Sequence, residues 1–365
     1  MIRYRPETGC AALADLRHDS LIASAPPAER WLLIESHTPW PRQALTALHR
    51  ETPQLTPAQL TLPQLTPPHP ATPQQPTAAQ DPPSAQPQTA APQAATPAQA
   101  GVPAQAGVPA QAGAPAPAGV SGRLGDEVVR LCRRLGYRAV LIRRYGRVDR
   151  TRPRRWGIVD SRPGHESIRW GELPTDEHLL DVLAGRDPGT VSHEPVYLVC
   201  THGRHDACCA VRGRPVAAAL AAAYPERTWE CSHIGGDRFA ANIVVLPHSL
   251  FYGHVPPTRA VELAKQYDQG VVVPDLLRGS GAFIPPVQAA QHFARAAGHS
   301  PALGNLLPQS VEELRNHHWR IVLASTNGQL TVEVSAHLDS VDARLTCAGS
   351  TPSQIRRFEL HTLTT

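Results

Sequence analysis

Four of the seven cysteines lie within 32 residues, and a histidine and an aspartate lie close to them in the sequence. Two short segments carry these residues, VCTHGRHDACCAVRG at 199–213 and WECSHIGGDRFAANIVV at 229–245. Thiolate, imidazole and carboxylate groups all bind metals, and thiolate-rich sets favour zinc or iron–sulfur clusters. The candidate metal ligands are Cys200, Cys208, Cys209, Cys231, His233 and Asp237.

The surrounding sequence predicts how these residues are positioned. Cys200 closes the apolar run PVYLVC, which is typical of a buried strand, and a helix is predicted through Ala223 after the Cys-Cys pair. Cys231 closes a second strand, RTWEC. Asp206 is expected to cap the helix, whose N-terminal dipole favours anionic sulfur. Both segments are therefore expected in loops at one edge of a sheet.

These two segments resemble the sucrase/ferredoxin-like family, and the stretches APPAERWLLIE, RWGIVDSRPG and LRGSG are similar to its bacterial members. The resemblance implies a thioredoxin fold that can carry a [2Fe–2S] cluster. It covers nearly all of the chain outside a proline-rich insertion. No pair of carboxylates that would support glycoside hydrolysis stands out, despite the word sucrase in the family name.

The resemblance also implies a ligand set. Fungal relatives use two cysteines nine residues apart and a His-x-Gly-Gly-His motif, which correspond here to Cys200, Cys209 and His233. Asp237 occupies the position of the second histidine. The fourth ligand is therefore Asp237, Cys231 or Cys208, unless no stable cluster is held. Imidazole ligands would raise the reduction potential, as suits a one-electron carrier.

The remaining cysteines and histidines receive simpler interpretations. Cys10, Cys132 and Cys347 lie outside the two segments and are expected to be packing residues. His202 and His205 are interpreted as exposed loop histidines, or as donors to cluster sulfur.

Three other functions compete with that of an electron carrier for unidentified donor and acceptor proteins. A zinc site could use the same ligands, and the vicinal Cys208–Cys209 pair suggests a thiol–disulfide oxidoreductase, although no Cys-x-x-Cys begins the helix. The arginine-rich segment 143–156 could contact nucleic acid. We do not expect that binding, because the chain has a single lysine, Lys265, and therefore a general arginine bias. A redox carrier is expected rather than an enzyme with its own substrate.

Alternating strand and helix patterns predict an α/β protein with two thioredoxin-like units and a small β-rich C-terminal part. A helix near Gln43, strands in the first unit at 137–142, 156–160 and 167–170 and a helix at 176–183 are expected there. LRGSG is expected to form a turn, and three strands are expected near the C-terminus. The predicted domains are 1–50 with 122–192, 193–299 and 300–365, with residues 51–121 inserted in the first of them.

The insertion accounts for much of the unusual composition. It holds 17 of the 38 prolines and has no aromatic residue, so it is predicted to be disordered and rich in polyproline II. Charged residues are scattered through the first 20 positions, where a signal peptide would have an apolar core. No apolar run approaches the roughly 18 residues of a membrane span. A cytoplasmic protein with reduced thiols and no membrane contact is expected.

Overall fold

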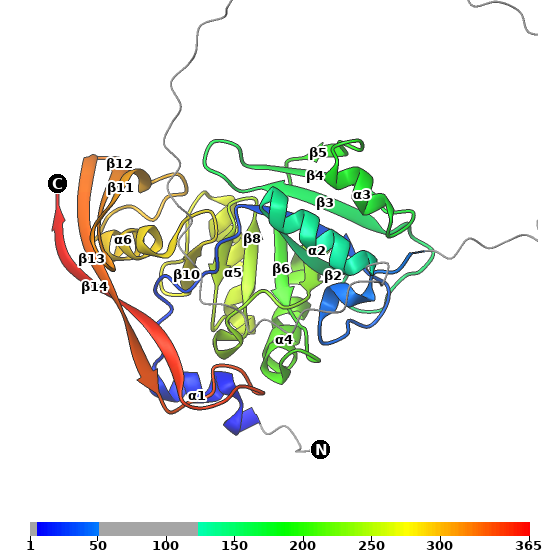
Figure 1. Cartoon of the computed structure of the whole chain (residues 1–365), viewed down its shortest axis with the longest axis horizontal. Helices are drawn as coiled ribbons and strands as arrows, with labels where there is room; N and C mark the ends of the chain where they lie inside the picture. The colour runs from blue at the N-terminus through cyan, green and yellow to red at the C-terminus, as the bar shows by residue number, and fades with distance from the viewer. Residues whose placement is uncertain (1–5, 51–122) are drawn as a thin grey trace, which may run out of the picture. The chain divides into compact units, whose positions relative to one another are not determined.

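A ten-stranded mixed sheet forms the centre of the protein, and a separate four-stranded antiparallel sheet follows it near the C-terminus (Figure 1). This computed structural model describes residues 6–50 and 123–365. The predicted disordered insertion, 51–121, lies outside the described residues. The predicted domain boundaries remain predictions; the boundary at 192/193 falls between strand β5 (Thr190–Ser192) and strand β6 (Val196–Cys200).

The first half of the large sheet follows the expected order of strands and helices. Strands β1 and β2 are parallel, β3 pairs antiparallel with β1, and β4 and β5 extend the sheet antiparallel beyond β3. The elements are β1 (Arg30–Glu35), α2 (Leu124–Leu135), β2 (Tyr137–Arg143), β3 (Arg155–Asp160), β4 (Ser167–Glu172), α3 (His178–Leu183) and β5 (Thr190–Ser192).

The second half repeats this order. Strands β6 and β7 are parallel, β8 pairs antiparallel with β6, and β9 and β10 continue outward antiparallel. The elements are β6 (Val196–Cys200), α4 (Ala207–Ala223), β7 (Thr228–Cys231), β8 (Ile243–Leu246), β9 (Leu250–Tyr252), α5 (Pro257–Asp268) and β10 (Leu277–Ser280).

The two halves meet where β2 pairs antiparallel with β7, so the sheet order is β10-β9-β8-β6-β7-β2-β1-β3-β4-β5. Only two residue pairs make this junction, Ile142 with Cys231 and Arg143 with Glu230. An Arg143–Glu230 ion pair at 2.7 Å and the stacked rings of Trp170 and Trp229 reinforce it. One apolar core contains residues from both halves, so burial joins them across the junction.

Helices cover the large sheet through alternate strand residues. The face that carries Leu32 and Ile34 packs against α2 and α3, whereas the face that carries Tyr197 and Val199 packs against α4 and α5. Helix α2 ends where expected, because Gly136 adopts a left-handed conformation with φ 74° that a glycine reaches without a steric penalty.

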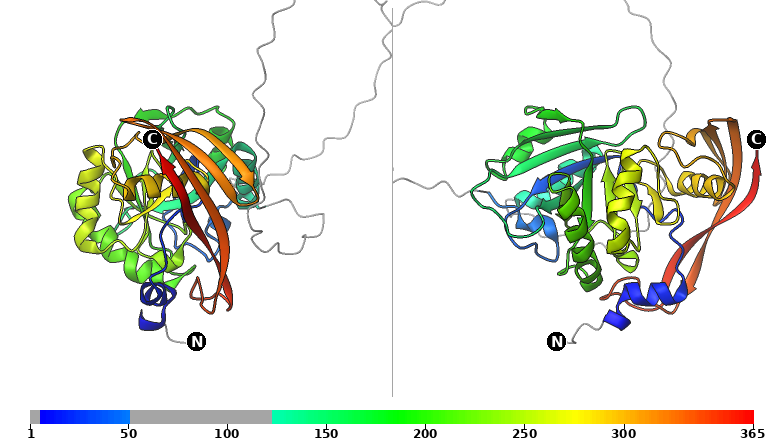
Figure 2. Two further views of the ribbon diagram at one scale, coloured as in Figure 1. Left: turned by 90° about the vertical axis from the view of Figure 1, so that its left-hand side faces the viewer. Right: turned by 180° about the vertical axis from the view of Figure 1, so that it is seen from behind.

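The C-terminal sheet packs on helix α6 (Pro285–Ala296), as Figures 1 and 2 show. Val287, Ala290 and Ala294 of α6 share an apolar cluster with Ile321 and Val332 of the sheet. Its strands are β11 (Leu307–Arg315), β12 (His318–Ser325), β13 (Gly328–Val341) and β14 (Ser353–Thr364).

Several local predictions differ from the structure. The C-terminal sheet has four strands where three were expected, and LRGSG contributes strand β10 where a turn was expected. The predicted helix near Gln43 is the short 3-10 turn η2 (Ala44–Ala47), while helix α1 (Cys10–Arg17) and the 3-10 turn η1 (Pro6–Thr8) were not predicted. None of the described helices is both long and apolar enough to cross a membrane.

Candidate metal centre

The ends of two parallel strands bring the first two candidate cysteines together. Cys200 ends β6 and Cys231 ends β7, and the two residues are register partners. Helix α4 then packs tightly against the end of β6, because Gly213 presents no side chain there. A Cβ atom on Gly213 would lie 2.1 Å from the Cys200 carbonyl oxygen. This close approach places the first turn of α4, with Cys209, beside Cys200.

Cys200, Cys209 and His233 form one group of potential ligands. Their sulfur and imidazole nitrogen atoms all lie within 4.8 Å of one another. Both cysteines are 1% exposed, whereas 27% of the His233 side chain reaches solvent. The group therefore lies just beneath the surface, with the imidazole toward solvent.

A second group shares His233 and adds Asp237 and His205, again with ligand atoms within 4.8 Å of one another. Asp237 lies in the 3-10 turn η4 (Asp237–Phe239), and its Oδ1 accepts a hydrogen bond from the Cys209 thiol at 3.1 Å. The same oxygen lies 2.9 Å from His233 Nδ1, and Oδ2 lies 3.6 Å from His205 Nε2. The rings of His205 and His233 stack with centroids 3.7 Å apart.

The electrostatics separate the groups into anions and cations. Hydrogen bonds from Cys209 and Cys231 lower the pKa of the Cys200 thiol well below its usual value. Burial alone would lower the pKa of His233, but hydrogen bonds to Asp237 and Cys200 raise it to about 9. Burial opposes ionisation of Asp237, yet His205 and His233 lower its pKa to about 2. The single charge of the His233 imidazolium therefore offsets only part of the negative charge of the thiolate and the carboxylate.

The loop between His233 and Asp237 is held by a buried arginine. Arg278 is 2% exposed and donates hydrogen bonds to the Gly235 carbonyl at 2.9 Å and to Asn242 Oδ1 at 2.8 Å. A Cβ on Gly236, whose φ is 80°, would lie 2.4 Å from this guanidinium group. Burial lowers the pKa of Arg278 to about 9. The Gly-Gly pair thus lets the loop close onto a positive charge.

These residues fit a metal or an iron–sulfur cluster. Two thiols and an imidazole converge in one group, a carboxylate joins them through a second group that shares the imidazole, and thiolate-rich sets select zinc or iron–sulfur clusters. Among the residues that the structure describes, the buried Asp237 Oδ2 accepts no hydrogen bond. An unsatisfied buried carboxylate oxygen is costly, and a bound cation would satisfy it.

Comparison with known protein families gives a match over most of the chain. The model of the family described as Sucrase/ferredoxin-like matches residues 21–279. The chain belongs to the sucrase/ferredoxin-like family. No curated protein and no solved structure matches the chain. The resemblance expected from the sequence is therefore confirmed, and the match spans every residue of the candidate centre described above.

Two predicted ligands of this sucrase/ferredoxin-like protein, Cys231 and Cys208, have surroundings that differ from those of Cys200 and Cys209. Cys231 lies beside Cys200, but its buried thiol has a raised pKa, chiefly because of burial. The sulfur of Cys208 lies 3.5 Å from that of Cys347, and the thiol of Cys209 contacts Asp237. The vicinal cysteines therefore belong to two different clusters of side chains.

Two histidines that were interpreted as exposed loop residues, His202 and His205, contact His233 in the structure. His202 is 2% exposed, not a surface residue, and its Nε2 lies 2.8 Å from the Pro41 carbonyl oxygen. Its Nδ1 accepts a hydrogen bond from the His233 backbone at 3.3 Å. His205 stacks on His233. Their close spacing to the cysteines in HGRHDACC was the available sequence signal.

The arginine-rich segment 143–156 runs from the end of β2 to the start of β3 in the first half of the sheet. Arg144 donates hydrogen bonds to the Pro225 and Glu226 carbonyls, and Arg154 pairs with Asp176 at 2.6 Å. The segment contributes to an arginine-lined cleft of about 620 Å³. Part of its positive charge is therefore used within the fold.

Proposed function

We propose that this protein is a one-electron carrier of the cytoplasm, with a [2Fe–2S] cluster bound by Cys200, Cys209, His233 and Asp237. The observation that carries the proposal is the convergence of two buried thiols and an imidazole within 4.8 Å. When bound, such a cluster accepts and releases one electron without substrate chemistry.

The neighbouring residues support electron exchange. His233 and His205 have side chains that are 27% and 31% exposed, so the imidazole side of the centre lies near solvent and within reach of a docked protein. Arg278 places a positive charge behind the loop, and a nearby positive charge favours the reduced state. The donor and acceptor are proposed to be proteins, and nucleic acid is not proposed as a ligand.

The pairing of strands supports assignment of both halves of the large sheet to the thioredoxin fold. Each half has the order strand, helix, parallel strand, two antiparallel strands and helix. The parallel βαβ connection within each half is a common unit of α/β proteins. In the second half, the two parallel strands of this unit end at Cys200 and Cys231.

Anaerobic purification followed by iron and sulfide analysis tests the proposal. We expect about two irons and two sulfides per chain, visible absorption that fades on reduction, and a paramagnetic signal in the reduced protein. Cys200→Ser and Cys209→Ser should each remove the iron and the absorption. Cys132→Ser is the matched control, because Cys132 is similarly buried but belongs to helix α2 and to another core cluster.

A colourless, iron-free protein would overturn the cluster assignment, and so would full iron retention in both serine variants. Zinc lost from those variants instead of iron would favour a zinc site. A thiol–disulfide oxidoreductase is less well supported, because Cys208 and Cys209 contact Cys347 and Asp237, respectively.

A further inference from the structure

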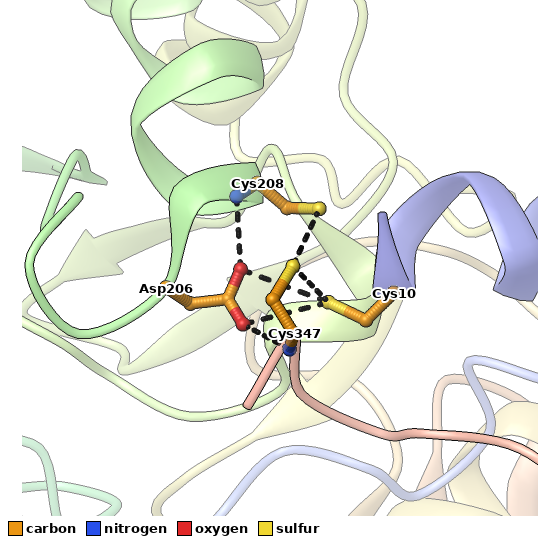
Figure 3. A group of neighbouring side chains, drawn as sticks. All are labelled: Cys10, Asp206, Cys208 and Cys347. Carbon is orange, nitrogen blue, oxygen red and sulfur yellow. Dashed lines mark hydrogen bonds between the residues drawn. The ribbon is translucent and has the colours of Figure 1, made fainter. Parts of the chain in front are cut away.

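A second group of potential ligands lies at the start of α4, and two of its members lie outside residues 21–279. Cys10 is the first residue of α1, and Cys347 lies between β13 and β14. Asp206 and Cys208 complete the group from the N-terminus of α4. Figure 3 shows the three sulfurs and the carboxylate pointing toward one another. All four ligand atoms lie within 4.8 Å of one another.

The spacing within this group fits one tetrahedral ion. Cys347 Sγ lies 3.5 Å from Cys208 Sγ and 3.7 Å from Cys10 Sγ. Cys10 Sγ lies 3.6 Å from Asp206 Oδ2. Zinc bonds of about 2.3 Å to sulfur and about 2.0 Å to oxygen would separate two sulfurs by about 3.8 Å, and a sulfur from the oxygen by about 3.5 Å. The printed distances therefore need only small adjustments.

The carboxylate in this group is held in place by the backbone. Asp206 Oδ1 accepts a hydrogen bond from the Cys208 backbone at 2.8 Å, and Oδ2 accepts one from the Cys347 backbone at 2.6 Å. A carboxylate oxygen has two lone pairs and can accept two hydrogen bonds. Each oxygen of Asp206 therefore keeps a lone pair for a cation after it has accepted its backbone hydrogen bond. Such fixed outer bonds orient metal ligands before binding.

Two of the cysteines lie at helix N-termini, although hydrogen bonds with Cys208 and Cys347, together with burial, raise the pKa of the Cys10 thiol while no cation is bound. Cys10 and Cys208 both lie in the first turn of a helix, where the helix dipole stabilises negative charge. Cys10 is 1% exposed and Cys208 is fully buried, whereas Cys347 is partly exposed. The group is thus shielded on most sides and has a route to solvent at Cys347.

Cys10, Cys208 and Cys347 pack with Ala11 and Ala240 in a small apolar cluster, but apolar packing does not require a carboxylate among them. A helix cap needs only Asp206, yet cysteines from near both ends of the sequence converge on the same carboxylate. The buried Asp206 carboxylate carries a negative charge, and burying a charge costs free energy unless hydrogen bonds or a cation offset it. Three sulfurs with tetrahedral spacing favour zinc, whose structural sites are mostly sulfur and imidazole, and the Asp206 carboxylate takes the place of the fourth ligand here.

We propose that Cys10, Cys208, Cys347 and Asp206 bind one zinc ion, separate from the centre around Cys200. Zinc displaces the thiol protons into solvent, and four Zn–ligand bonds form without any change of oxidation state. The ion fastens α1 and the β13–β14 connection to α4. Its ligand Cys208 adjoins Cys209, so the zinc site also fixes the backbone that carries a proposed cluster ligand.

Metal analysis of the full chain tests this proposal independently of the cluster. We expect one zinc per chain in the wild-type protein, and less than about a tenth of that in Cys10→Ser and Cys347→Ser. The iron content of both variants should stay measurable, which shows that they fold. Cys132→Ser should keep both metals. Cys200→Ser should lose iron and keep zinc. The metal contents therefore distinguish a failure of the zinc assignment from a failure of the cluster assignment.

A titration of the wild-type chain covers the case in which the serine variants do not fold. The zinc is removed with a chelator and Co²⁺ is added anaerobically, and we expect thiolate-to-cobalt absorption that saturates at one equivalent and is displaced by zinc. Equal zinc content in the wild type and both variants would overturn the proposal. So would absence of cobalt binding, or a Cys208–Cys347 disulfide in protein kept anaerobic throughout.

Discussion

Asp237 is the residue on which the chemistry of the proposed cluster depends most. Its carboxylate contacts the Cys209 thiol and the His233 imidazole, and its Oδ2 is 3.6 Å from His205. A carboxylate ligand adds negative charge that stabilises the oxidised cluster, whereas a second imidazole would not. The identity of this one side chain should therefore set the reduction potential.

Substitutions at this position test that role. We expect Asp237→Ala to lower the iron content several-fold, and Asp237→His to keep iron while raising the midpoint potential by on the order of 100 mV, because a neutral ligand replaces an anion. His205→Gln should keep its iron. Iron analysis and a redox titration provide the measurements. Loss of iron from His205→Gln but not from Asp237→Ala would instead assign His205 as the fourth ligand.

At the scale of elements, the approach of α4 to β6 positions the candidate centre. Gly213 faces the Cys200 carbonyl, where an added methyl group would lie at 2.1 Å. Any larger residue must push the helix away from the strand. Cys209 travels with the helix, whereas Cys200 stays with the strand.

Gly213→Ala should therefore weaken both the fold and the centre. We expect the free energy of unfolding to fall by about 1–3 kcal/mol, the cost of overpacking a core, and the iron content to fall with it. Val211→Ala is the matched control, because Val211 lies in the same helix but is 47% exposed. It should change neither the free energy of unfolding nor the iron content. Denaturant unfolding and iron analysis measure both effects. Wild-type values for Gly213→Ala would show that this contact does not set the spacing.

The sequence predicted most of the large sheet because most of its strands are short runs rich in apolar residues, separated by turn-forming residues. Strand β11 was missed because Leu307–Arg315 is mostly polar and exposed. Strand β10 was missed because it contains Arg278, a charged residue that the fold buries. The pairing of Cys10 with Cys347 spans 337 positions, and no local pattern encodes a contact of that kind.

At the scale of the whole molecule, the chain on either side of residues 51–122 belongs to one compact unit. Arg50 forms an ion pair with Glu127 at 2.5 Å, and Gly125 packs closely on the Leu45 carbonyl. The two chain ends that border the inserted segment therefore lie near each other, and a short linker can join them.

Replacing residues 52–121 with about eight glycine and serine residues should leave the iron and zinc contents unchanged. The unfolding free energy should rise by up to about 2 kcal/mol, because a shorter loop costs less entropy to close. Metal analysis and denaturant unfolding check both expectations. A variant that loses metal or unfolds more easily would show that the replaced segment contributes to the folded unit.

The repeated strand order gives the large sheet an approximate internal two-fold axis, which passes between β2 and β7. This symmetry relates strand β6 to strand β1. The last residue of β6, Cys200, therefore corresponds to the last residue of β1, Glu35. Glu35, His37 and Arg143 line the arginine-lined cleft at that second place. The same architectural position thus occurs twice in one chain: in the second half it carries thiols, and in the first half it carries a carboxylate, an imidazole and guanidinium groups instead.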